Sequence, residues 1–334
     1  MYKNQHRVTI KDVAFKANVS TATVSKIING KDQHISELTR QKVCAVISEL
    51  GYVPNSIARS LKEANTKTLG LVMPDIGNSF PEMAKGAQAE ALIHGYTVLF
   101  GSTDNNSIQE EKFLNVLKSK MVDGIIYVSS DYATSKRLLA DVSVPLVAID
   151  RKIDKLPNMG SVMIDNFAAM QDVADYITGK GCKNIAYITS DISMSPGKER
   201  YAGFVAGLKK AGLDFDKRLH YAGSFSVETG HIGAMMLMQR DADIDCIVCG
   251  NDLIAIGALS VCQKLHKKIP DDIKIMGFDD MYISKYLNPE LTTVRQDTYE
   301  MGRLAARMLI GHIESKLPLK DIILPYEIME RSTV

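Results

Sequence analysis

Three stretches of helical periodicity follow one another in the first fifty residues. Apolar positions three and four apart predict a helix after Thr9, a second after Ser20 that ends at Gly30, and a third that ends at Gly51. The expected inward-facing residues are Val13, Ala14 and Ala17, then Val24, Ile27 and Ile28, and then Val43, Val46, Ile47 and Leu50. Two short helices joined by a tight break and closed by a third form a helix-turn-helix. A small helical bundle that binds protein would show the same pattern.

The choice of residues at the start of the second helix favours DNA. In a helix-turn-helix, the exposed side chains at this point meet base edges in the major groove. Here they are Thr21 and Ala22, with Lys26 one turn later. Small residues from 20 to 23 let the helix lie deep in the groove. The sequence therefore predicts a DNA-reading head.

The rest of the chain alternates short apolar runs with amphipathic helices. The expected strands are 68–75, 96–102, 124–130, 144–150, 184–190, 246–250 and 273–280, and 321–334 is expected to hold the last strand. The expected helices are 81–94, 107–120, 197–212, 228–240 and 252–267. Apolar runs separated by helices imply buried parallel strands in doubly wound sheets. The predicted fold class is α/β, with a small all-α head and a bilobed body.

Composition fits a chain with several compact cores. The chain has 334 residues, of which 46% are hydrophobic and 24% charged, enough for two or three domains. No apolar run reaches the length of a membrane span, and the start lacks the apolar stretch of a secretory signal. Five scattered cysteines fit a reducing compartment. We expect a cytoplasmic protein.

The net charge of +1 hides an asymmetry. Residues 1–68 hold 11 Lys and Arg against 5 Asp and Glu, whereas residues 69–334 hold 29 against 34. A basic segment ahead of an acidic body is typical of a polyanion-binding terminus, although it also suits a solvated surface. The charge alone leaves both possibilities open.

Motifs for the common enzyme classes are absent from the sequence. It contains no dinucleotide-binding glycine pattern, no phosphate-binding loop with lysine, no serine-hydrolase elbow and no paired-histidine zinc motif. Cys246 and Cys249 would lie on opposite faces of a strand, which suits neither a metal ion nor a redox disulfide. We therefore expect no enzyme activity, no cofactor and no metal.

Two runs in the first sixty residues resemble the LacI/GalR family of transcription regulators. They are VTIKDVAFKANVSTATVSKIING and ISELTRQKVCAVISELGYVPNSIARSL, and the resemblance continues through nearly all of residues 8–334. It implies a homodimer that binds palindromic operator DNA, with no membrane partner. The implied DNA-binding residues are Thr9, Ser20, Thr21, Ala22, Thr23, Ser25, Lys26, Asn29 and Tyr52 in the head, and Ala58, Leu61 and Lys62 in the hinge.

The hinge is predicted to be a helix of marginal stability. Asn55 can cap a helix of about two turns, and isolated helices below ~12–15 residues are marginal in water. The resemblance implies that this helix pairs with its twin in the dimer. It also implies that Leu61 wedges between base pairs in the minor groove, an established mode of bending DNA. Movement of the two hinges apart would then release the DNA.

Polar side chains follow several of the expected strands of the body. Asp75, Asn78, Phe80, Asp150, Arg151, Asn251 and Asp279 all lie just beyond strand ends, where ligands bind in parallel sheets. The resemblance to periplasmic sugar-binding proteins adds Arg200, Phe225 and Gln296 to this ligand set. For Asp252 and Asp280 we favour a role in holding loops. Carboxylates, arginine and amides bind hydroxyl groups, and an aromatic ring covers the apolar face of a sugar.

These features together predict a transcription regulator, acting as a repressor whose operator affinity depends on a sugar or sugar derivative. The expected divisions are a head at 1–54, a hinge and linker at 55–67, and a body at 68–334. Its first lobe would take 68–165 and 297–320, and its second 166–296 and 321–334. Control by a corepressor ligand or a partner protein is the alternative, and a sugar-binding protein without a DNA role is a remoter one.

Overall fold

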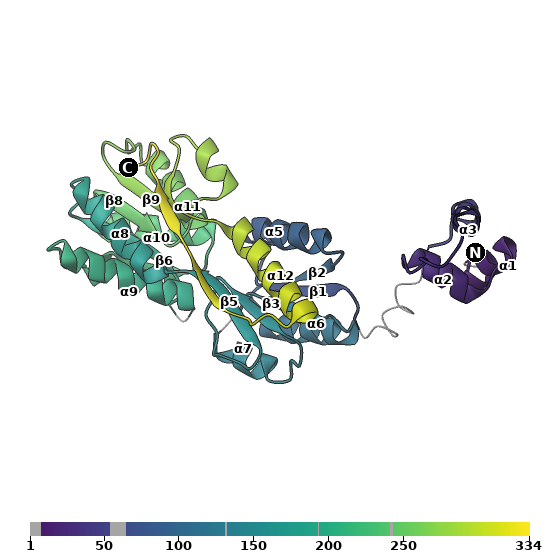
Figure 1. Ribbon diagram of the computed structural model, residues 1–334. Helices are drawn as coiled ribbons and strands as arrows, with labels where there is room; N and C mark the ends of the chain where they lie inside the picture. Colours follow the sequence, from purple (N-terminus) through teal and green to yellow (C-terminus); the bar gives the residue numbers. More distant parts are fainter. Residues whose placement is uncertain (1–7, 54–64, 131, 193, 241–242) are drawn as a thin grey trace, which may run out of the picture. The chain divides into compact units, whose positions relative to one another are not determined.

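The computed structural model describes residues 8–53, 65–130, 132–192, 194–240 and 243–334 (Figure 1). The chain folds into two compact units, 1–66 and 67–334. We call the first the head and the second the body, and each is described by itself. No helix among the described residues is both long and apolar enough to cross a membrane.

The head contains three helices around a small aliphatic core. They are α1 (Ile10–Ala17), α2 (Thr21–Ile28) and α3 (Glu37–Leu50). Side chains cap all three: Thr9 with Asp12 forms a capping box, and the Ser20 and Ser36 hydroxyls accept backbone N–H groups three residues on. Val13, Val24 and Val43 are fully buried between the helices. The helical pattern of the sequence is thus realised in the expected order.

The first lobe of the body is a six-stranded sheet in the order β11-β5-β4-β3-β1-β2. Every neighbouring pair of its strands is parallel. Its elements are β1 (Thr68–Met73), α5 (Phe80–Ile93), β2 (Thr97–Ser102), α6 (Ser107–Ser119), β3 (Gly124–Tyr127), α7 (Tyr132–Leu139), β4 (Leu146–Ile149), β5 (Met159–Ile164), α12 (Thr298–Ser315) and β11 (Asp321–Leu324).

The second lobe repeats this design with the order β12-β10-β9-β8-β6-β7. Only the β10–β12 pair is antiparallel. Its elements are α8 (Asn166–Gly179), β6 (Ile185–Ser190), α9 (Ser195–Lys210), η1 (Lys217–Leu219), β7 (His220–Gly223), α10 (Val227–Arg240), β8 (Cys246–Cys249), α11 (Asp252–Lys264), β9 (Lys274–Asp279), η2 (Tyr282–Tyr286), β10 (Thr292–Gln296) and β12 (Tyr326–Met329). The α/β class with two doubly wound sheets is confirmed.

The chain crosses between the lobes three times. Asp165 lies between β5 and α8, and Asp297 lies between β10 and α12, close to the expected crossovers. The third lies between β11 and β12 and not at the lobe boundary expected between residues 320 and 321, because β11 pairs with β5 in the first lobe and only β12 belongs to the second. Pro325 separates the two strands and cannot donate to a sheet ladder. The two strands are the yellow arrows at the end of the chain in Figure 1.

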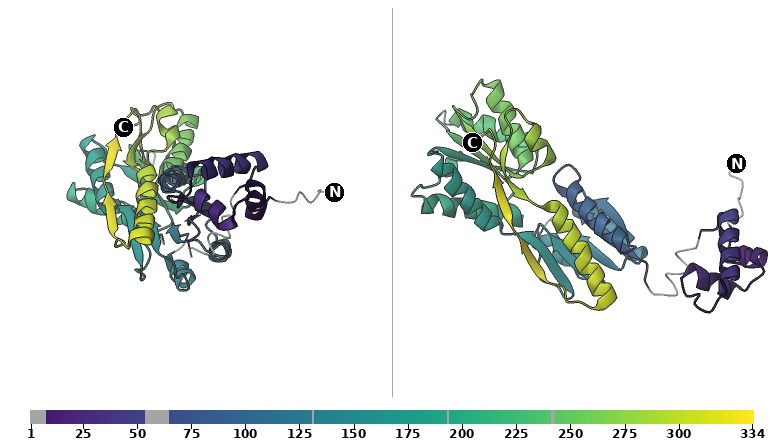
Figure 2. Two further views of the ribbon diagram at one scale, coloured as in Figure 1. Left: turned by 45° about the vertical axis from the view of Figure 1, so that its right-hand side comes forward. Right: turned by 45° about the horizontal axis from the view of Figure 1, so that its top comes forward.

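Helices α5 and α12 pack closely along the first lobe, as two further views show (Figure 2). A Cβ atom added to Gly86 would lie 1.9 Å from the Tyr299 carbonyl oxygen, and one added to Gly302 would lie 1.9 Å from that of Met83. Only glycine permits this approach of the two backbones. The contact fixes α5, whose start faces the second lobe, against α12, which follows the second crossover.

Candidate functional site

The side chains that follow the strands of both lobes meet in a cleft. One part of it, which we call the inner compartment, is lined by Asn78, Ser79, Phe80, Asp150, Arg151, Pro196, Arg200, Phe225, Asp279 and Gln296. The structure thus brings together eight of the ten residues predicted to bind ligand. The free volume among them is only about 10 Å³, which is roughly the minimum for one water molecule. The side chains of the inner compartment themselves fill most of its space.

Arg200 is the central cation of the inner compartment. It extends from α9, and its guanidinium donates to Asn166 Oδ1 and to the Gly250 carbonyl oxygen, each at 2.7 Å. A third nitrogen lies 3.6 Å from Asp279 Oδ1. The guanidinium carbon lies 3.6 Å from the centroid of the Phe278 ring, within the range of a cation–π contact. These contacts hold a buried positive charge in one orientation.

Asp279 is a buried carboxylate at the end of β9. Its backbone has a φ of 109°, a left-handed conformation that L residues rarely adopt outside special sites. Burial raises its pKa to about 8, although Arg200 opposes that shift. Gln296 Nε2 donates to Asp279 Oδ1 at 2.7 Å, while Gln296 Oε1 is buried without a partner. A ligand hydroxyl could satisfy that oxygen.

Asp150 and Arg151, which follow β4, are the charged residues that the first lobe contributes to the inner compartment. Asp150 has a φ of 64°, which turns the chain sharply after β4. Arg151 is 3% exposed, and its Nη1 donates to the Ser129 carbonyl oxygen at 2.7 Å. Its Nε is buried without a hydrogen-bond partner, and burial lowers its pKa. A buried guanidinium with an unused donor is suited to a polar ligand.

Asn78 and Asn251 connect the two lobes directly. Asn251 Nδ2 donates to Asn78 Oδ1 at 3.3 Å, and Asn251 Oδ1 caps α11 through the Ile254 N–H group. Asp75 Oδ1 accepts the N–H groups of Gly77 and Asn78 and so shapes the loop before α5. Burial raises the pKa of Asp75. Asn251 therefore contacts the other lobe through Asn78, but it does not itself line the inner compartment.

A second and larger space adjoins the inner compartment. We call it the outer chamber; its volume is about 810 Å³. It is lined by Asp75, Asn105, Ser130, Arg151, Asp191, Ile192, Met194, Ala222, Gly223, Ser224, Phe225 and Ser226. Arg151 and Phe225 line both spaces. Most of these residues escaped the sequence analysis, because serine and asparagine are ordinary loop residues and give no signal of their own.

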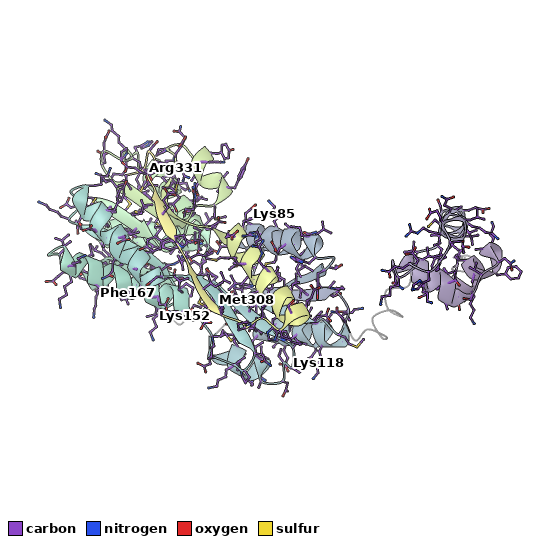
Figure 3. All side chains as sticks on the ribbon, viewed as in Figure 1. Lys85, Lys118, Lys152, Phe167, Met308 and Arg331 are labelled. Carbon is purple, nitrogen blue, oxygen red and sulfur yellow. The ribbon has the colours of Figure 1, made fainter. Side chains whose placement is uncertain are left out.

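Asp252 and Asp280 have the loop-holding contacts that we favoured for them. Asp252 is fully buried and accepts from the Met281 N–H group, the Ser284 hydroxyl and the Thr293 hydroxyl. Asp280 forms ion pairs with Arg295 and with Arg331, which Figure 3 labels. Both carboxylates are satisfied by the second lobe itself. Neither lines the cleft.

In the head, the start of α2 presents an open surface. Thr21, Ala22 and Lys26 are exposed. Ser20 is occupied with capping, since its hydroxyl accepts the Thr23 N–H group at 3.1 Å and contacts the Thr23 hydroxyl at 2.9 Å. Caps of this kind fix the start of a helix. The exposed trio therefore projects from a rigid helix terminus.

The other predicted DNA-binding residues of the head take supporting positions. Asn29 Nδ2 donates to the Ser25 carbonyl oxygen at 2.7 Å and so closes the last turn of α2. Thr9 is exposed and shares the capping box of α1. Tyr52 packs against the core of the head. The hinge residues Ala58, Leu61 and Lys62 lie outside the described residues.

Both the head and the body match models of known protein families. Residues 9–55 match the model of bacterial regulatory proteins of the lacI family, and residues 174–334 match that of the periplasmic binding protein-like domain. The chain is 37% identical over 329 residues to the HTH-type transcriptional regulator RegA of Clostridium saccharobutylicum, covering 97% of this chain and 98% of that protein. The chain belongs to the LacI family and is a DNA-binding transcriptional regulator.

Particular relatives extend this likeness over the full length. The ribose operon repressor of Halalkalibacterium halodurans is 35% identical over 311 residues, covering 92% of this chain and 91% of that protein. The structure of a complex of the transcriptional regulator CelR with cellobiose is 28% identical, with a TM-score of 0.75, and covers 98% of this chain and 100% of that one. The fold also matches a lac repressor dimer bound to operator and an anti-inducer, with a TM-score of 0.88 at 23% identity and 98% coverage of both chains.

Proposed function

We propose that this regulator is a repressor whose affinity for a palindromic operator is controlled by a small polyol, such as a sugar or a sugar derivative, bound between the lobes of the body. The observation that carries the proposal is the unused hydrogen-bonding capacity of the cleft. Arg151 Nε and Gln296 Oε1 are buried without hydrogen-bond partners, although Arg151 Nε lies 3.9 Å from Asp150 Oδ2, and buried polar atoms normally have one. A ligand with donor and acceptor groups would supply both.

The head supports the DNA half of the proposal. Thr21 and Ala22 are small and exposed at the start of α2, and Lys26 adds a positive charge one turn later. A short helix with this face can enter a major groove, where side chains meet base edges. One such head reads few base pairs, so a palindromic site needs two copies of the chain.

Exposed apolar side chains on the body support a homodimer. Leu92 and Ile93 on α5 and Phe100 on β2 are each more than 60% exposed in the first lobe. Exposed apolar groups of this size mark surfaces for association. Sedimentation of the full chain tests this: we expect a dimer at micromolar concentration, and a monomer under conditions that permit operator binding would contradict it.

The central experiment measures operator binding with and without candidate sugars. An operator is first selected from random duplexes by the full-length protein, and its binding is then followed by fluorescence anisotropy of labelled DNA. We expect the ligand to change the operator affinity by about 5–150-fold, the usual range of coupling between sites. Release of DNA by the ligand is the expected sign. Corepression would reverse the sign and leave the site unchanged.

Two variants test the DNA half of the proposal. Lys26→Ala should shift the base preference of the selected operator, whereas Leu61→Ala should weaken specific binding and leave much of the non-specific binding, which depends on phosphate contacts. Equal losses on specific and random DNA for both variants would contradict these two roles. A protein with no preference for any duplex would contradict the proposal as a whole.

A further inference from the structure

The two spaces of the cleft differ in how much they can hold. The inner compartment has about 10 Å³ of free volume, and its charged groups already face one another. The outer chamber has about 810 Å³, within the ~300–1,000 Å³ range of small-molecule sites. Of these two spaces, the outer chamber therefore offers a ligand more room, while the inner compartment can take only a small part of it.

Sheet order explains where the outer chamber lies. Its residues follow β1, β2, β3 and β4 in the first lobe, and in the second they follow β6 or lie at the end of β7 and just beyond it. In both sheets the edge strands β2 and β7 lie at the opposite side from β11 and β12, where the chain crosses between the lobes. The outer chamber is therefore the side of the cleft away from the crossovers. Arg151 and Phe225, shared by both spaces, connect it to the inner compartment.

The walls of the outer chamber are chemically unequal. The first lobe contributes only hydrogen-bonding side chains, namely Asp75, Asn105, Ser130 and Arg151. The second lobe contributes the apolar side chains of Ile192, Met194, Ala222 and Phe225 together with the polar ones of Asp191, Ser224 and Ser226. A sugar ring has a polar edge of hydroxyls and an apolar face of C–H groups, so it matches two walls of this kind.

The charge of the chamber disfavours anionic ligands. Its ionisable lining residues are the carboxylates of Asp75 and Asp191 and the single guanidinium of Arg151. In the neighbouring inner compartment Asp150 balances Arg200, and Asp279 adds little negative charge at neutral pH because burial raises its pKa to about 8. A phosphate group placed here would meet more negative than positive charge at short range.

The size of the chamber exceeds that of a single sugar ring. Its volume of about 810 Å³ lies towards the upper end of the ~300–1,000 Å³ range of small-molecule sites, so it has room for more than one ring. Phe225 is the one aromatic residue among the described residues that line the chamber. A flat nucleobase would need apolar groups on both of its faces, whereas the first-lobe wall is polar.

We propose that most of the ligand lies in the outer chamber, and that the ligand is an uncharged molecule with two sugar rings, that is, a disaccharide. This inference rests on the proposed function, because it names the ligand class of the same cleft. It also makes Ile192, Met194 and Ala222 determinants of ligand size, through the space that they leave open.

Calorimetry on the full-length protein tests the ligand class. The probes are maltose, cellobiose and trehalose, with glucose, glucose 6-phosphate and cytidine as the smaller, charged and nucleoside comparisons. We expect at least one disaccharide to bind tenfold or more tightly than glucose, and glucose 6-phosphate to bind more weakly than glucose. Tighter binding of glucose, of its phosphate or of cytidine than of every disaccharide would overturn the inference.

Variants of the chamber test the place of binding. Ala222→Trp adds a large side chain at an exposed lining position, and we expect it to lower the disaccharide affinity at least tenfold while glucose affinity changes less than twofold. Ile192→Ala should lower disaccharide affinity about threefold by removing apolar contact. Leu265→Ala is the matched control, because Leu265 has similar exposure in the same lobe, 54% against 49%, and does not line the chamber.

Thermal melting of each variant confirms that the fold is intact, and the operator assay separates the two levels of failure. A probe that shifts operator affinity but ranks glucose or cytidine first, or whose binding is unchanged in Ala222→Trp, contradicts the outer-chamber inference alone. If none of the probes binds or alters operator affinity, the disaccharide inference and the sugar-controlled function both fail. Disaccharide binding that Ala222→Trp abolishes, with the operator response lost in parallel, supports both.

Discussion

Two buried carboxylates of the second lobe, Asp252 and Asp279, lie in contrasting surroundings. Asp252 accepts three hydrogen bonds from its own lobe. Asp279 accepts one from Gln296 and faces Arg200 at 3.6 Å, beside a glutamine oxygen without a partner. Burial raises both pKa values, to about 6 and about 8. A polar cluster that is complete holds the fold, whereas one that is incomplete is poised for a ligand.

The largest effect is expected from Asp252→Ala. This change leaves the Met281 N–H group and the Ser284 and Thr293 hydroxyls without their acceptor in a fully buried place. Unsatisfied buried donors cost ~1–3 kcal/mol each before relaxation, so we expect a loss of about 3 kcal/mol in the free energy of unfolding. Urea denaturation measures it. A loss below ~1 kcal/mol would mean that the cluster is not structural.

Asp279→Asn should change stability little and ligand affinity strongly. The amide keeps the size of the side chain and, like the protonated carboxyl group that a pKa of about 8 leaves at neutral pH, carries no charge, so we expect stability within about 1 kcal/mol of the parent chain or above it. Ligand affinity should fall tenfold or more, because the amide cannot ionise when ligand hydroxyls are offered to it, and hydrogen bonds to a charged carboxylate are the stronger ones. Calorimetry and operator anisotropy provide the two readouts. A normal ligand response together with strong destabilisation would reverse the assignment of the two aspartates.

The pH dependence of stability separates the same two residues. The folded-state pKa of Asp279 is raised from 3.8 to about 8, so the folded protein holds a proton that the unfolded chain releases. The stability that this proton contributes is complete below about pH 4 and is lost as the pH rises to about 8. The pKa of Asp252 is raised to about 6, so the stability that its proton contributes is already lost near pH 6. A change in stability between pH 6.5 and pH 8.5 therefore reports the ionisation of Asp279 and not that of Asp252.

Denaturation of the parent chain and of Asp279→Asn at these two pH values provides the measurement. We expect the stability of the parent to fall relative to the variant by about 1 kcal/mol or more over this interval, since one pKa unit corresponds to ~1.4 kcal/mol. All other groups titrate equally in both proteins, so they cancel in the difference. Parallel pH profiles would show that Asp279 is ionised throughout.

The sequence predicts what depends on local pattern and misses what depends on pairing between distant segments. The head helices and their caps at Thr9, Ser20 and Ser36 follow from spacing and capping chemistry. The strand 159–164 was not expected, and 321–334 was expected to hold one strand of the second lobe. Its division into β11 and β12 at Pro325 depends on which sheet each half joins, and alternation of side chains does not encode this.

Prediction of the cleft from the sequence is limited in the same way. Inspection of strand ends located Asp75, Asp150 and Asp279, because charged residues in such places are unusual. Arg200 lies inside α9 and came from the family resemblance alone. The outer chamber was missed, since its serines and its apolar side chains acquire meaning only when β6 and β7 are set opposite β1 and β3.

The smallest predicted effect concerns an ion pair at the margin of the cleft. Lys152, in the first lobe, forms an ion pair with Glu199 of the second, and its backbone N–H group donates to Ser195 Oγ at 2.8 Å. Figure 3 labels Lys152 together with Lys85, whose ion pair with Glu82 lies within one helix. Both lysines are more than half exposed, so each pair contributes ~0–1 kcal/mol. Only the ion pair of Lys152 joins the two lobes.

We expect Lys152→Ala to weaken ligand binding about two- to threefold, because the bound state gains from closed lobes while the open state does not. Lys85→Ala should leave ligand affinity unchanged within error. Calorimetry at ~0.05 M and ~0.5 M salt sharpens the comparison, since screening should remove most of the Lys152 effect at the higher value. Equal effects of the two substitutions, or an effect of Lys152→Ala that persists in high salt, would mean that this ion pair does not stabilise lobe closure.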